Sequence, residues 1–68
     1  MKHPAILIEY DSSHYGIAVF RVGFDGKVIG MVTSDPTRSL SNRFAAYDAD
    51  QNRLGFAQDL YDVARLYY

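Results

Sequence analysis

The segment YGIAVFRVGFDGKVIGMVTS, residues 15–34, decides the fold. Two runs rich in β-branched and aromatic residues, 15–24 and 27–34, flank the dipeptide Asp25-Gly26. Asp-Gly between such runs predicts a hairpin, because a type I′ turn needs positive φ at both of its central residues. The sequence therefore predicts two antiparallel strands joined by a tight turn at Asp25-Gly26.

A two-residue turn also fixes which residues of the hairpin face one another. On the side that we expect to be the core, the pairs are Val22 with Ile29, Phe20 with Met31 and Ala18 with Thr33. On the opposite side the pairs are Val19 with Val32, Arg21 with Gly30 and Gly23 with Val28. The second side is half apolar, which is unusual for a surface that only meets water. We expect either that the helix covers one side and a partner the other, or that the sheet is curled with both faces mostly covered. Gly23 and Gly30 are expected to permit close backbone approach or a bend in the sheet.

Three further strands and one helix are predicted around this hairpin. The strands are residues 5–10, 43–48 and 53–57, with a polar turn at 12–14, an unpatterned loop or single helical turn at 34–42 and a turn at 48–52. From Asp59, an expected N-cap, the residues Leu60, Val63, Ala64 and Tyr67 form the apolar stripe of a helix of about ten residues. The fold class is therefore small α+β: an antiparallel meander of four to five strands packed against one C-terminal helix, in a single domain covering residues 1–68.

The composition narrows the classes of function. Of the 68 residues, 49% are apolar and none is cysteine, so the chain is expected to form a small core without disulfides or thiolate zinc. Neither His3 nor His14 has a second ligand at zinc spacing, and no metal or cofactor is expected. No apolar run approaches the length of a membrane span, and the N-terminal residues do not resemble a signal peptide. We therefore expect a cytoplasmic protein without membrane contact.

Two polar segments resemble sites but favour structural interpretations. In residues 48–52, oxygen-bearing side chains alternate as in a calcium loop, but Arg53 stands where an EF-hand needs glycine. An ordinary turn is the favoured interpretation, and the sequence leaves cation binding open. Ser12, Ser13 and His14 suggest a nucleophile and a base, but no residue pattern marks an orienting acid or an oxyanion hole. We expect no enzymatic activity.

An aromatic surface is expected on the C-terminal helix. Tyr61, Arg65 and Tyr68 follow one another at i, i+4 and i+7, beside the apolar stripe that includes Tyr67. Tyrosine and arginine are enriched at interface hot spots. The same rings could instead fold over the sheet and complete a small core, and both alternatives stay open. The candidate partner-binding residues are Tyr61, Arg65, Tyr67, Tyr68, Val19, Val32 and Arg21.

Two functions from different classes follow. The first is a small non-enzymatic module that acts by steric docking on another protein. The candidate partners are a large host complex and a second copy of the chain. Chain length is the only basis for a narrower hypothesis, an accessory protein of a phage or mobile element that inhibits a host defence system as anti-CRISPRs do. The alternative is a small nucleic-acid-binding regulator, similar to three-stranded DNA-binding modules in the order of its elements only. It would use Arg21, Lys27, Arg43 and Arg53, although a net charge of −1 weakens it.

Overall fold

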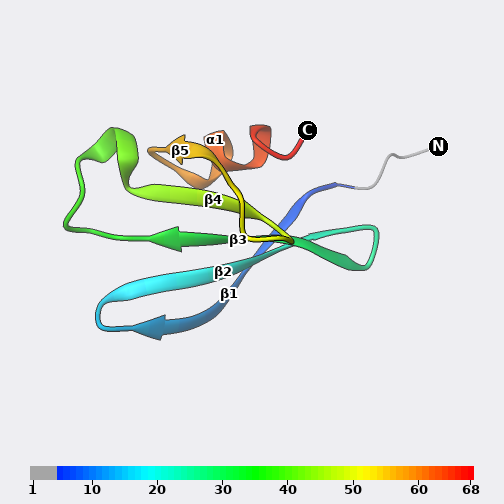
Figure 1. Ribbon diagram of the computed structural model, residues 1–68, viewed down its shortest axis with the longest axis horizontal. Helices are drawn as coiled ribbons and strands as arrows, with labels where there is room; N and C mark the ends of the chain where they lie inside the picture. The colour runs from blue at the N-terminus through cyan, green and yellow to red at the C-terminus, as the bar shows by residue number, and fades with distance from the viewer. Residues whose placement is uncertain (1–4) are drawn as a thin grey trace.

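One antiparallel sheet carries the chain, and the structure, a computed structural model, describes residues 5–68. Its elements are β1 (Leu7–His14), β2 (Ile17–Phe24), β3 (Lys27–Ser34), the 3₁₀ turn η1 (Leu40–Asn42), β4 (Phe44–Asp48), β5 (Arg53–Ala57) and α1 (Leu60–Arg65). Each strand pairs with the next in the order β1-β2-β3-β4-β5 (Figure 1). The prediction of an antiparallel meander of four to five strands followed by one C-terminal helix is confirmed, and the structure has five strands. His3 lies outside the described residues.

The first hairpin turns later than the sequence indicated. We predicted a strand that ends at residue 10, a polar turn at 12–14 and a second strand from Tyr15; this is wrong, because β1 continues to His14. The turn falls at Tyr15-Gly16, where φ is 53° and 82°. A register shift between Tyr10 and Ser12 makes Asp11 the extra residue of a β-bulge. The bulge lets a strand pass through a polar run that otherwise resembles a loop.

A second bulge changes the register of the central hairpin. Gly23 faces Val28 as predicted, and Asp25 and Gly26 at the turn have φ of 51° and 77°. Beyond this pair the predicted register is wrong, because Ile29 is an extra residue on β3. The actual pairs are Val22 with Gly30, Arg21 with Met31, Phe20 with Val32, Val19 with Thr33 and Ala18 with Ser34. Met31 and Val32 have therefore exchanged sides relative to the prediction.

The core cluster lies on one side of the sheet and includes Val63 of α1. Its fully buried members are Val22, Val32, Ala46 and Val63, with Ala57 nearly buried. Leu66 and Tyr67, just after the helix, pack against this cluster. Figure 1 shows α1 beside β4 and β5, so the β1 end of the core face receives less cover.

The helix is shorter than predicted. It has six residues rather than about ten, and it begins, as expected, with Asp59 as its N-cap: Asp59 Oδ1 accepts a hydrogen bond from the Asp62 amide at 2.8 Å. After Arg65 the amides of Leu66 and Tyr67 bond to carbonyls three residues back. This tightening is common at helix ends, and it turns Leu66 and Tyr67 toward the sheet. Among residues 5–68, no helix is long and apolar enough to cross a membrane.

Candidate functional site

The side of the sheet opposite α1 is the main candidate surface, and we call it the open face. By strand register it carries Leu7, Glu9, Val19, Arg21, Gly23, Val28, Met31, Thr33, Ala45, Tyr47, Arg53 and Phe56. The loop that contains η1 reaches this face near β5. Leu7 and Val28 are 57% and 63% exposed. Strands β1 and β3, on either side of β2, thus present bulky aliphatic side chains to solvent on a face that could instead have been polar.

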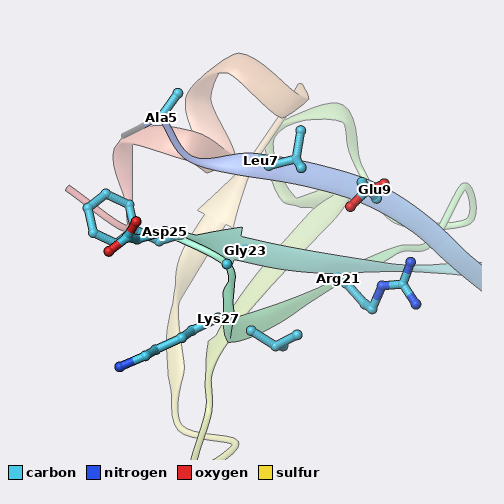
Figure 2. A pocket seen from close by; sticks show the side chains of 10 residues that line it. Ala5, Leu7, Glu9, Arg21, Gly23, Asp25 and Lys27 are labelled. Carbon is cyan, nitrogen blue, oxygen red and sulfur yellow. The ribbon is translucent and has the colours of Figure 1, made fainter. Parts of the chain in front are cut away.

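A hollow on the open face explains what Gly23 does there. Gly23 lies between Leu7 of β1 and Val28 of β3, its direct cross-strand neighbours, and has no side chain to fill the space between them. The result is a hollow of about 290 Å³, which extends to Glu9, Arg21 and Lys27 (Figure 2). A Cβ on Gly23 would have its nearest contact at 3.6 Å, so close packing does not demand glycine here. The hollow is therefore a surface feature that a side chain could fill.

A second hollow continues the first across β3. It also measures about 290 Å³ and is lined by Val28 and Met31 together with residues of the β4–β5 turn, including Asp48 and Gln51. Val28 lines both hollows. The two hollows therefore adjoin at Val28.

Arginine side chains gather on one aromatic ring at the β5 end of the open face. The guanidinium carbon of Arg53 lies 4.7 Å from the centroid of the Phe56 ring, and that of Arg38 lies 5.7 Å from it. Arg38 lies in the loop before η1, and its Nε is 3.7 Å from Asp35 Oδ2. A turn holds this loop in place: Asp35 Oδ1 accepts hydrogen bonds from the amide and the hydroxyl of Thr37, which hold the pKa of the Asp35 carboxyl below its usual value. We call Arg38, Arg53 and Phe56 the arginine cluster.

The helix presents the exposed tyrosines that the sequence indicated. Tyr61 and Tyr68 are 87% and 80% exposed, and Arg65 is exposed, 3.8 Å from Asp62. Tyr67 behaves differently. It is half-buried, and its hydroxyl donates to the carbonyl oxygen of Tyr47 at 2.6 Å. Of the two alternatives for these rings, Tyr67 follows core completion, while Tyr61 and Tyr68 stay available at the surface.

One predicted partner-binding residue is not accessible. Val32 is 0% exposed and belongs to the core cluster, so its assignment to a partner surface is wrong. The cause is the extra residue Ile29, which rotates the following part of β3 by one position. Val19 and Arg21, which were expected on the same side, do lie on the open face.

The basic residues of the nucleic-acid alternative are distributed over the fold. Arg21 lies on β2 and forms an ion pair with Asp11 at 3.3 Å, while Arg53 lies on β5, three strand spacings or about 14 Å away. Lys27 lines the first hollow. Arg43, before β4, is half-buried, and its Nε is enclosed without a hydrogen-bond partner. The four residues do not form one continuous basic patch.

The segment around Ser12 forms a local hydrogen-bond chain. Ser12 Oγ donates to Asp11 Oδ2 at 3.2 Å, and His14 Nε2 lies 3.2 Å from the same hydroxyl oxygen. Because the single hydroxyl proton points to Asp11, Ser12 accepts from the His14 ring. A serine nucleophile needs the opposite arrangement, in which histidine accepts the serine proton. This geometry is a polar surface network.

The Asp48–Asn52 turn uses its carboxylate internally. Asp48 Oδ1 accepts from the amides of Asp50 and Asn52, both at 2.9 Å, and Oδ2 accepts from the Asn52 side chain at 3.3 Å. The Asn52 backbone is the largest cause of the lowered pKa of the Asp48 carboxyl. Among residues 5–68, no three His, Cys, Asp or Glu side chains gather closely enough to hold a metal ion. The hydrogen bonds of this turn are those of an ordinary Asx-type turn.

Sequence reasoning missed Arg38, Phe56 and the hollow beside Gly23. Arg38 and Phe56 meet only because the loop folds back on β5. A signal for the hollow was present, since a glycine inside a strand marks a bulge or a gap in packing. The bulge between Val22 and Gly23 and the hollow on the open face now account for that signal.

No protein-family model, no curated protein and no solved structure matches this chain at a significant level.

Proposed function

We propose that this protein is a non-enzymatic, cytoplasmic binding module that docks on a partner protein through the open face of its sheet. The observation that carries the proposal is the pair of exposed aliphatic residues, Leu7 and Val28, that flank the hollow beside Gly23. Scattered apolar residues on a surface are ordinary, but these two lie on either side of Gly23 and border one recess. A protruding apolar side chain of a partner would fill such a recess and displace water from both residues.

The mechanism is steric occlusion. The open face combines exposed apolar residues beside the Gly23 hollow with the positively charged arginine cluster at its β5 end, and protein interfaces usually combine apolar and charged areas. Val19 and Arg21 belong to this surface. Tyr61, Arg65 and Tyr68 form a second candidate surface on the helix, but each tyrosine stands out alone rather than around a hollow. A role as an inhibitor of host defence in a phage or mobile element stays a hypothesis based on chain length.

The competing proposal is a nucleic-acid-binding regulator. What supports it is Arg53, which projects from the sheet beside an aromatic ring. The ion pair between Arg21 and Asp11, and the distance between β2 and β5, work against a continuous track for a phosphate backbone. Retardation of duplex DNA at low salt separates this proposal from the first. We expect no retardation.

A crosslinking experiment tests the docking proposal. A photoreactive amino acid is placed at residue 28, on the open face, or at Tyr15, at the tip of the β1–β2 turn, and each protein is irradiated in a lysate of the source cells. We expect a specific crosslinked protein from residue 28 and none from residue 15. Capture of the same protein should be lost in Val28→Lys and kept in Tyr15→Lys, which adds the same charge away from the open face.

Three results would overturn the docking proposal. One is the absence of any protein that depends on residue 28. Another is loss of partner capture in Tyr61→Lys but not in Val28→Lys, which would assign the interface to the helix. The third is capture of a second copy of the chain alone, measured by light scattering, which makes the open face a dimer interface.

A further inference from the structure

The arginine cluster holds its cations in an arrangement suited to a ligand. The guanidinium carbon of Arg53 lies over the Phe56 ring, 4.7 Å from its centroid, and that of Arg38 lies 5.7 Å from the same centroid. A guanidinium that lies over an aromatic ring is held in one plane and keeps the N–H donors at its edge directed outward. The arginine side chain then loses less conformational entropy when a ligand binds, because it is already ordered in the free protein.

The charge of Arg53 is not neutralised within the fold. The ion pairs among residues 5–68 join Arg21 to Asp11, Arg38 to Asp35 and Arg65 to Asp62, and none includes Arg53. Arg38 is only partly neutralised, because its contact with Asp35 is 3.7 Å long and Asp35 already accepts two hydrogen bonds from Thr37. The cluster therefore carries excess positive charge at one place on a chain whose net charge is −1.

We infer that the arginine cluster binds a carboxylate of an acidic segment of the partner protein. The inference rests on the proposed function, since it assigns a chemistry to the margin of the docking surface. A carboxylate matches the edge of a guanidinium through two parallel hydrogen bonds. Met31 and Tyr47 lie in the same cross-strand row as Arg53, so the segment carries an apolar residue next to its acidic one.

The extent of the basic area favours an acidic peptide over a nucleic acid. Excess positive charge surrounds a single ring, whereas a nucleic-acid strand needs a row of cations along its backbone. In the row that contains Arg53, the next cation is Arg21 on β2, which is paired with Asp11 and faces Glu9 across the strands. A spot of this size accommodates one or two carboxylates rather than a chain of phosphates.

The test measures binding of defined probes to the full chain by amide chemical shifts. The probes are the capped peptide Glu-Glu-Leu-Glu-Glu, its counterpart with glutamine in place of each glutamate, an oligothymidylate of matched charge, and inorganic phosphate. We expect saturable shifts at Arg53 and Phe56 with the acidic peptide and none with the glutamine peptide. Arg53→Gln should weaken binding by at least about tenfold, because it removes a charge-assisted hydrogen-bonded contact with the carboxylate. Phe56→Leu, which removes the stacking surface, should also weaken it.

Matched variants separate a site from general charge attraction. Arg21→Gln removes the same charge from the same face but from a residue that is already ion-paired, so the affinity for the peptide should change less than twofold. Arg53→Lys keeps the charge but loses the planar edge, and it should bind more weakly than the wild type. Each variant must first give the amide spectrum of the folded chain.

Four outcomes would overturn the inference. They are equal weakening by Arg21→Gln and Arg53→Gln, tighter binding of the oligothymidylate than of the peptide, shifts with inorganic phosphate of the same size, and no binding of any probe. A failure here leaves the docking proposal standing if residue 28 still crosslinks a partner. If residue 28 crosslinks no partner but the acidic peptide still binds, the docking proposal is wrong and the carboxylate site remains.

Discussion

The ring of Tyr67 lies directly on Gly30. A Cβ at residue 30 would come within 2.6 Å of Tyr67 Cε1 and would also collide with the backbone carbonyl of Tyr47. The absence of a side chain at Gly30 therefore allows the Tyr67 ring to pack directly on the backbone of β3. The Tyr67 hydroxyl then reaches the Tyr47 carbonyl on β4, so one side chain joins the end of the chain to the middle of the sheet.

Gly30→Ala should destabilise the fold. The new methyl group has no space on either side, and overpacking of this kind costs about 1–3 kcal/mol. Urea unfolding followed by circular dichroism measures the change. Gly23→Ala is the matched control, because its Cβ meets nothing closer than 3.6 Å and should shift the free energy of unfolding by no more than about 1 kcal/mol. Equal losses in both variants would mean that contact with Tyr67 is not the reason for Gly30.

Tyr67→Phe should remove one hydrogen bond and leave the packing in place. The hydroxyl that donates to Tyr47 at 2.6 Å is half-buried, and the loss of such a bond lowers the free energy of unfolding by about 1 kcal/mol. Tyr61→Phe removes the same atom from an exposed ring and should leave stability unchanged. If both variants unfold at the same urea concentration as the wild type, the bond contributes nothing to stability.

Local signals were enough to predict the order of the elements. Turn-forming residues separate β-rich runs, and the period of the apolar residues changes after Asp59, so a meander followed by a helix could be predicted. Asp59 is the N-cap, as its chemistry indicated, because capping depends only on residues within one turn. The helix length was not predictable in this way, since packing of Leu66 and Tyr67 on the sheet ends it.

The sequence did not predict which residues of β3 face the core, because the position of a bulge depends on pairing with neighbouring strands. Ile29 is unpaired although nothing in residues 27–34 marks it, and one extra residue exchanges the sides of Met31 and Val32. The arginine cluster was inaccessible to sequence reasoning for a related reason. Arg38 and Arg53 are separated by a loop and a strand, and they share a ring only after the loop folds back.

The Tyr67 phenol should ionise above its ordinary pKa of 10.0. Burial is the largest cause, because it disfavours the phenolate; the hydrogen bond to Tyr47 acts in the other direction, and the nearby charge of Asp48 again raises the pKa. Since the folded pKa is raised, the contribution of the phenol to stability is complete below pH 10.0 and decreases as the pH rises beyond it. Titration of tyrosinate absorbance in the wild type and in Tyr67→Phe should show that the transition lost in the variant lies above pH 10.0. Loss of a transition at or below 10.0 would contradict the burial of this group.

The Asp48 carboxyl should titrate below 3.8. Its charged form accepts hydrogen bonds from Asn52 and Asp50, which lower the pKa of the folded state relative to the unfolded chain. The stabilisation by the carboxylate is therefore present above pH 3.8 and is lost as the pH falls through the lower, folded value. Asp48→Asn keeps one oxygen for the two backbone amides but loses the charge and the second accepting oxygen, so it should be less stable than the wild type at neutral pH. The difference should shrink in acid, where the Asp48 carboxyl is protonated. Carbon-detected titration of the Asp48 side chain gives the midpoint directly, and a midpoint at or above 3.8 would show that the turn does not hold the carboxylate as the geometry requires.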